Sequence, residues 1–352
     1  MLGFMEADRA QLSKIDAQIL ELQDSLSALR AEKQLVEERL NSYKYPVLTL
    51  PNEMVSDILV HCLPPYPSCP PLIGVSSPTS LTHICRKWRT IALATPELWR
   101  AIRVDDVSSF HRSASEVWAK RSRSLPLSVN IEIHRSHEIN LPLLAHRAHW
   151  EHLTLSVVTP IILTIDDPMP LLRHLELTQY NMASSFELRD APQLCSVVFQ
   201  RVGAVTLPWQ QLTHLTMNDE LMDKCLLILR QTTNLIYCDV TVTVWGARPD
   251  VLNHQSITLP FLEALIFRMS PENLGTSFLD LFTVPTLRSL ELREPCIWPD
   301  PIGYLTSFIA RSHCRLQTLE ITGRRRIHDD AYRFAFSSIP ELIFDLSYFD
   351  PS

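Results

Sequence analysis

The amino-acid sequence predicts a multidomain chain of the α plus α/β class: an N-terminal coiled-coil helix, a small helical module and a curved α/β solenoid. Three observations predict this fold. Apolar residues recur every three or four positions near the start, two short helical patterns follow, and a leucine-containing phrase then recurs eight times. With 352 residues, the chain is long enough for several domains. We expect the three parts to cover residues 1–44, 45–104 and 105–352.

The first part has an apolar seam with coiled-coil spacing. Its core positions follow a heptad over four repeats: Leu12, Ile15, Ile19, Leu22, Leu26, Leu29, Lys33, Val36 and Leu40. Lys33 is polar at a core position, and Glu32 would face Glu37 across a parallel pair of identical helices, so both features disfavour that pair. Two alternatives stay open. The helix self-associates, or it folds back on its own chain or pairs with a different partner.

The second part has the pattern of two short helices. Pro51 and Glu53 suit a first helical turn, where proline needs no N–H partner and a carboxylate favours the helix dipole. Apolar residues then recur at helical spacing as far as Leu63, and a second helix is expected from about Leu81 to Ala94. The six prolines at residues 64–78 predict an extended insertion between the two helices.

This module resembles the F-box. The resemblance rests on an ordered set of motifs: Leu50-Pro51-Asn52-Glu53, Cys85-Arg86-Lys87-Trp88-Arg89 and Pro96-Glu97-Leu98-Trp99. It implies docking onto an adaptor of the SKP family, and through that adaptor onto a cullin, in an SCF-type ubiquitin ligase. Carried over by position, the adaptor-binding residues would be Leu50, Pro51, Glu53, Ile58, Leu59, Leu98 and Trp99. The Pro-rich insertion departs from the compact pattern of the family.

The third part repeats a phrase of the form L-x-x-L-x-[apolar]. Complete copies begin at Leu172, Leu194, Leu212, Leu235, Leu262, Leu287 and Leu316, at intervals of 22, 18, 23, 27, 25 and 29 residues, and an incomplete copy covers residues 151–155. Alternating apolar residues at this spacing are typical of leucine-rich repeats, in which each copy supplies a short strand. The region resembles the irregular repeats of F-box proteins of the type abundant in filamentous fungi. The alternative is a β-rich or α/β domain with coincidental phrases.

Between these strands we expect helices at residues 221–229 and 304–310, and a helix start at Asp329. If the strands stack in register, their outward residues form a candidate substrate face: Glu176, Asp239, Glu291 and Glu320 in a central column, with His174, His214 and Tyr237 in the preceding outward column, two residues earlier on each strand. Solenoids usually bind partners on such a face. The acidic column would suit a basic or amide-rich segment; the alternative is a row of simply solvated strand residues.

The sequence contains no pattern that predicts catalysis, a metal site or a cofactor. The patterns G-x-G-x-x-G, G-x-x-x-x-G-K-[ST], G-x-S-x-G and H-E-x-x-H are missing. His134 and His137 would lie on opposite faces of an expected strand, and the eight cysteines lack zinc-site spacing. We therefore expect a non-catalytic protein without catalytic residues, metal ligands or cofactors.

Charge and hydropathy indicate which classes of partner and which cellular compartment to expect. The net charge of −7, with no long basic tract, disfavours nucleic acid. No apolar run approaches the length that spans a bilayer, no signal peptide is visible, and scattered cysteines suit a reducing compartment, so we expect the cytoplasm, the nucleus or both. The expected function is the substrate-recognition subunit of an SCF-type ubiquitin ligase, with an unknown protein substrate. The alternative is a non-catalytic scaffold with leucine-rich repeats and no role in ubiquitination.

Overall fold

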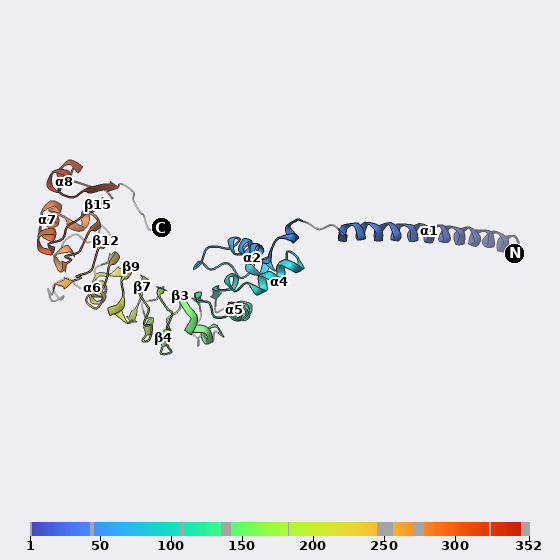
Figure 1. The fold of residues 1–352 in the computed structure, drawn as a ribbon, viewed down its shortest axis with the longest axis horizontal. Coiled ribbons are helices and arrows are strands. Elements are labelled where there is room, and N and C mark those ends of the chain that lie inside the picture. Colours follow the sequence, from blue (N-terminus) through green and yellow to red (C-terminus); the bar gives the residue numbers. More distant parts are fainter. Residues whose placement is uncertain are drawn as a thin grey trace. The chain divides into compact units, whose positions relative to one another are not determined.

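The computed structural model describes residues 2–42, 46–105, 109–134, 142–181, 183–244, 256–269, 278–323 and 325–345. These residues form a mixed α/β chain with a long N-terminal helix and a parallel sheet of 11 strands (Figure 1). The chain divides into two compact units, Met1–Asp57 and Ile58–Ser352.

The first unit consists mainly of helix α1 (Leu2–Ser42), which has 41 residues and is about 61 Å long at 1.5 Å per residue. Strong helix formers such as Leu, Ala, Glu, Gln and Arg dominate its sequence. The short 3₁₀ helix η1 (Pro46–Thr49) and the first residues of α2 (Asn52–His61) complete the unit. The long helix is confirmed, whereas its pairing as a coiled coil stays a prediction.

The predicted single helix from Leu81 to Ala94 is wrong. The structure has two helices there, α3 (Pro78–Leu81) and α4 (Arg86–Ala94), followed by the 3₁₀ helix η2 (Pro96–Trp99). The break occurs because Cys85 is extended, with φ −157° and ψ 170°, and its sulfur accepts a hydrogen bond from the backbone N–H of Trp88. Cys85 is therefore the N-cap of a new helix rather than an interior residue.

The second unit is built around the 11-stranded sheet, whose strands are β1 (Ala101–Asp105), β2 (Leu127–Ile133), β3 (Trp150–Val157), β5 (His174–Gln179), β7 (Ser196–Gln200), β9 (His214–Leu221), β10 (Tyr237–Val244), β12 (Ala264–Met269), β14 (Ser289–Arg293), β15 (Thr318–Thr322) and β16 (Glu341–Asp345). Neighbouring strands are parallel and follow one another in chain order across the sheet. All eight repeated phrases form strands, as predicted. β1, β2 and β16 extend the sheet at its two edges.

The connections between these strands contain helices, 3₁₀ helices and two small sheets. They are α5 (Ser109–Arg121), η3 (Pro142–His149), β4 (Ile162–Ile165), β6 (Ser185–Leu188), β8 (Ala204–Thr206), η4 (Trp209–Gln211), α6 (Met222–Leu229), β11 (Ile257–Thr258), η6 (Phe278–Leu281), β13 (Phe282–Thr283), η7 (Glu294–Ile297), α7 (Pro301–Ser312) and α8 (Asp329–Ala335). α5, β4, α6, α7 and α8 lie along one side of the large sheet (Figure 1). α6, α7 and α8 match the three helices that the sequence predicts.

The core lies between the large sheet and these connections. One leucine-rich column crosses the sheet in strict register through Ile102, Val129, Leu153, Leu175, Val197, Leu215, Cys238, Leu265, Leu290, Leu319 and Leu342. From Ile102 to Leu319 every member is buried. The residues between the buried positions alternate to the opposite face and are mostly partly exposed. The period-2 pattern therefore gives the sheet one apolar face and one largely polar face.

The Pro-rich insertion packs against the first strands of this unit. The Tyr66 hydroxyl donates a hydrogen bond of 2.8 Å to Glu151, and the Ser128 hydroxyl donates one of 2.6 Å to the carbonyl oxygen of Pro67. The Arg100 guanidinium lies 3.8 Å from the centre of the Tyr66 ring. These contacts attach the insertion to the sheet, next to the start of β3.

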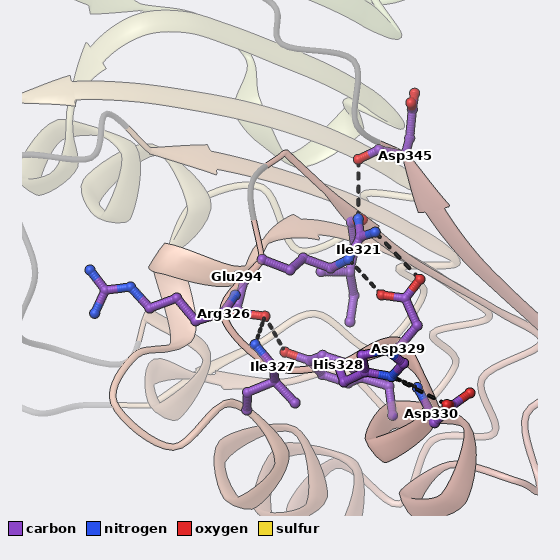
Figure 2. A network of polar contacts seen from close by, with 10 residues as sticks. Glu294, Ile321, Arg326, Ile327, His328, Asp329, Asp330 and Asp345 are labelled. Carbon is purple, nitrogen blue, oxygen red and sulfur yellow. Dashed lines mark hydrogen bonds and ion pairs between the residues drawn. The ribbon is translucent and has the colours of Figure 1, made fainter.

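A buried polar network anchors the other end of the sheet (Figure 2). The Glu294 carboxylate accepts hydrogen bonds from the backbone N–H of Arg326 at 2.7 Å and from the Tyr332 hydroxyl at 3.0 Å. A third, longer bond of 3.4 Å comes from the N–H of Ile327. Since Glu294 is buried, these donors replace the water that its carboxylate loses on folding. The network fixes the segment between β15 and α8.

Candidate functional site: the polar face of the sheet

The outward residues of the strands form a central column on the polar face. In register they are Thr154, Glu176, Val198, Thr216, Asp239, Ile266, Glu291, Glu320 and Ile343. The structure places the four predicted acids in this column. It brings Glu291 and Glu320 onto adjacent strands, whereas β7 and β9 separate Glu176 from Asp239.

An arginine that sequence reasoning missed joins two of these acids. Arg268 on β12 donates a hydrogen bond of 2.9 Å to Asp239 on one neighbouring strand and one of 2.8 Å to Glu291 on the other. Partial burial by itself would lower the pKa of Arg268, because it disfavours the charged guanidinium. The carboxylates of Asp239 and Glu291 have a larger combined effect, so the pKa of Arg268 is raised. The signal was present, because Arg268 is the next outward residue after Ile266. Two of the four acids therefore carry an internal counter-charge.

Of the other two acids, Glu176 lies on β5, and Glu320 lies among further carboxylates on the last strands. Burial raises the pKa of Glu320, and the neighbouring carboxylates of Glu291 and Asp345 raise it further. Glu341 on β16 accepts a hydrogen bond of 3.0 Å from the Thr318 hydroxyl on β15. Mutual repulsion of these carboxylates favours a cationic or hydrogen-bond-donating group beside them.

Rings occupy the outward position two residues before the central residue on β3, β5, β9 and β10, and Ser196 occupies it on β7. His152 and His174 stack with their centres 4.4 Å apart and their planes 6° from parallel, and His214 stacks on Tyr237 at 6.0 Å. Tyr66 from the Pro-rich insertion meets the His152 ring edge-on at 5.4 Å. Burial lowers the pKa of both His152 and His174, which favours their neutral form at pH 7. The polar face thus changes from aromatic to acidic along the sheet.

The predicted adaptor-binding residues divide into two groups by exposure. Pro51, Glu53 and Ile58 are exposed and Leu50 is half-buried. The other three are buried: Leu59, Leu98 and Trp99.

Trp99 has well-defined internal contacts. Its indole N–H donates a 2.9 Å hydrogen bond to the carbonyl oxygen of Ala92, and its ring meets Trp118 edge-on at 5.6 Å. The Arg121 guanidinium lies 4.5 Å from the centre of the Trp99 ring. In this conformation Trp99 ties η2 to α4 and α5, and its contact with an adaptor stays a prediction.

No protein-family model matches the chain, and no curated protein does. Its resemblance to the F-box is therefore carried by the motifs alone.

In the part of the chain that the structure describes, no group of three or more His, Cys, Asp or Glu residues is placed to hold a metal ion. His134 lies 3.3 Å from Glu132, whereas His137 falls outside the described residues. Of the eight cysteines, Cys225, Cys238, Cys296 and Cys314 are buried. Burial raises the pKa of the Cys296 thiol to about 11, which favours the unreactive thiol over the thiolate.

None of the described helices combines the length and the apolar character that a transmembrane segment needs.

Proposed function

We propose that this chain is an F-box-type substrate receptor. Residues 50–99 dock an SKP-family adaptor, and through it a cullin, while the polar face of the sheet holds a target protein. The observation that carries the proposal is the ordered set Leu-Pro-x-Glu, Cys-Arg-x-Trp-Arg and Pro-x-Leu-Trp, followed directly by a repeat region. Ubiquitin transfer takes place on other subunits of such a ligase, in the cytoplasm, the nucleus or both. This chain raises the local concentration of the substrate.

The sheet supports the leucine-rich-repeat part of the proposal. Its parallel strands follow chain order, and each repeated phrase aligns with the next without a shift of its leucine column. This arrangement is what a curved solenoid produces, because each repeat contacts its immediate neighbours. We assign the polar face to the concave side of the solenoid, where the acidic end suits a basic or amide-rich segment of the target.

The exposed side of α2 supports the docking part. Met54 and Ile58 lie four residues apart, on one face of the helix, and are 53% and 39% exposed. Val55 and Leu59 on the other face are fully buried. Since α2 has buried leucine and valine on one side, its exposed methionine and isoleucine suit a protein contact. In this proposal Leu50, Pro51, Glu53 and Ile58 touch the adaptor, and Leu59, Leu98 and Trp99 hold the module in shape.

Co-elution with a purified SKP-family adaptor on size-exclusion chromatography tests the docking. We expect the wild-type chain and the adaptor to co-elute with one adaptor bound per chain. Ile58→Lys should weaken it at least tenfold, about 1.4 kcal/mol, because a charged amine would be buried at the contact. Ile162→Lys is the matched control, since Ile162 is also exposed but lies on β4. Leu50→Ala combined with Pro51→Ala should also weaken the complex.

A folded chain that binds no adaptor would contradict the proposal. That result would favour the second candidate, a non-catalytic scaffold protein without a role in ubiquitination. The observation behind this candidate is the exposed apolar seam of α1, which suits an assembly role. Equal binding by wild type and Ile58→Lys would leave adaptor binding intact but remove α2 as the contact surface.

A further inference from the structure

The apolar seam of α1 is exposed along its whole length. The eight apolar seam residues Leu12, Ile15, Ile19, Leu22, Leu26, Leu29, Val36 and Leu40 are 40–68% exposed. An isolated helix gains most of its stability from packing an apolar face, and monomeric proteins rarely leave such a stripe in water. A partner for this seam is therefore required, and the charges beside the seam indicate which one.

A parallel pair of α1 helices fits these charges poorly. Identical positions face each other in that arrangement, so Lys33 would face Lys33 in the core. Glu32 at a g position would also face Glu37 at the following e position. Both contacts join like charges.

An antiparallel pair in one register removes both conflicts. Each core layer then joins an a residue to a d residue: Leu12 to Val36, Ile15 to Lys33, Ile19 to Leu29 and Leu22 to Leu26, while Leu40 meets Asp8 at each end of the pair. The two lysines are separated by 18 residues, about 27 Å along the helix axis. Each lysine meets the Ile15 layer, where its amine can extend toward the Asp16 carboxylate of the other helix.

The flanking charges select the same register. In an antiparallel pair, e positions face e positions, and this register places Asp16 opposite Arg30 and Arg9 opposite Glu37. A shift of one heptad in one direction would place Asp16 opposite Glu37. A shift in the other direction would place Arg9 opposite Arg30. Among these three registers, the first alone joins opposite charges and no like charges at its e positions.

We propose that α1 pairs with α1 of a second copy of this chain, as an antiparallel coiled coil in this register. The inference does not rest on the proposed function. Ser42, where α1 ends, lies beside residue 6 of the other helix, so the two copies of Ser42 are about 54 Å apart along the axis. The remainder of each chain therefore leaves from opposite ends of the pair.

The molar mass of the full chain tests the pairing. Light scattering on a size-exclusion column should give about 81 kDa, twice the chain mass of 40.3 kDa. Leu29→Gln should weaken the dimer at least a hundredfold, whereas Leu35→Gln should change its dissociation constant less than threefold. The two leucines are a matched pair, because they are 61% and 59% exposed in the same helix and Leu35 lies off the seam. A monomeric wild-type chain at micromolar concentration would overturn the proposal.

Charge exchange and crosslinking test the orientation. Arg30→Asp should weaken the dimer about tenfold, and adding Asp16→Arg should restore it, since the two positions face each other only in the antiparallel pair. Gln23 faces its own copy there, so the two thiols that Gln23→Cys introduces should form an intermolecular disulfide that mass spectrometry can identify, while Gln34→Cys on the outer face should form none. No restoration together with no disulfide in the Gln23→Cys variant would indicate a parallel dimer and overturn the proposed orientation.

Discussion

Helix α1 and the large sheet both have leucine and isoleucine at regular spacing, but the exposure of these residues differs between the two regions. The leucine column of the sheet is buried from Ile102 to Leu319, while the seam of α1 is exposed. The difference comes from the period. Strands with a period of 2 are covered by the connections of the same chain, whereas a heptad seam is covered only by another helix. The period-2 pattern is buried within one chain, whereas the heptad pattern of α1 needs a second helix to bury it.

The largest expected effect is on the free energy of unfolding, and one substitution in each region tests the contrast. Leu290→Ala removes a fully buried side chain from the centre of the leucine column and leaves a cavity. We expect it to lower the free energy of unfolding by about 2–5 kcal/mol. Leu29→Ala removes an equal group from the exposed seam and should change the unfolding of the sheet by less than about 0.5 kcal/mol. Urea denaturation followed by tryptophan fluorescence measures both, because Trp99, Trp118 and Trp150 are buried in the second unit.

Equal losses at the two positions would break the comparison. That outcome would mean that the α1 seam is part of the same cooperative unit as the sheet. A small loss for Leu290→Ala alone would instead mean that neighbouring strands collapse into the space that the leucine leaves.

A second, smaller effect extends the contrast to carboxylates within the sheet unit. Glu294→Gln keeps the size of the buried side chain but turns one acceptor oxygen into an NH₂ donor. That group would face either the Arg326 N–H at Oε1 or the Ile327 N–H and Tyr332 hydroxyl at Oε2. We expect a loss of about 1–3 kcal/mol in the free energy of unfolding. Glu320→Gln on the polar face is the matched control and should stay within about 0.5 kcal/mol of wild type. Urea midpoints decide, and equal midpoints for the two variants would show that the Glu294 network adds little stability.

The strands could be predicted from the sequence because seven of the eight repeated phrases combine alternation with a leucine two positions before the strand, and the copy in β3 has the alternation alone. β16 was missed because its segment Glu341–Asp345 has three consecutive apolar residues in place of alternation and no leucine two positions before it. The break at Cys85 was also missed, since apolar spacing alone does not reveal an extended N-cap whose sulfur bonds to the Trp88 N–H. Local patterns predict elements well, whereas caps depend on single side chains.

The polar face was predicted only in part, for a related reason. Alternation was enough to place Glu176, Asp239, Glu291 and Glu320 in one column, because strand register follows from the leucines. The role of Arg268 was missed, since it depends on which strands flank β12. The contact of Tyr66 with Glu151 joins residues 85 positions apart and lies outside any repeat. Long-range pairs of this kind leave no periodic signal in a sequence.

The smallest expected effect concerns pH and the stacked histidines at the aromatic end of the polar face. Burial lowers the pKa of both His152 and His174 below 6.5, the ordinary value for histidine. The charge of the stacked His174 lowers the pKa of His152 further, Arg173 lowers that of His174, and Glu151 opposes both effects. As the pH falls below 6.5, the unfolded chain binds protons at these positions before the folded chain does. The free energy of unfolding should therefore be unaffected above about pH 7.5 and decrease as the pH falls through 6.5 toward the folded pKa values.

Replacing both rings with glutamine should flatten this decrease, because the variant has no imidazole to protonate in either state. Urea midpoints at pH 7.5, 6.5 and 5.5 measure the slope for wild type and for the His152→Gln, His174→Gln double variant. His328→Gln is the control, since the side chain of His328 is 82% exposed and its replacement should leave the slope unchanged.

If the double variant keeps the wild-type slope, the acid sensitivity comes from other groups. If wild type instead gains stability between pH 7.5 and 5.5 and the double variant does not, the pair binds protons more tightly when folded. The stacking would then stabilise a charged ring, and the aromatic end of the face would attract anions rather than neutral groups.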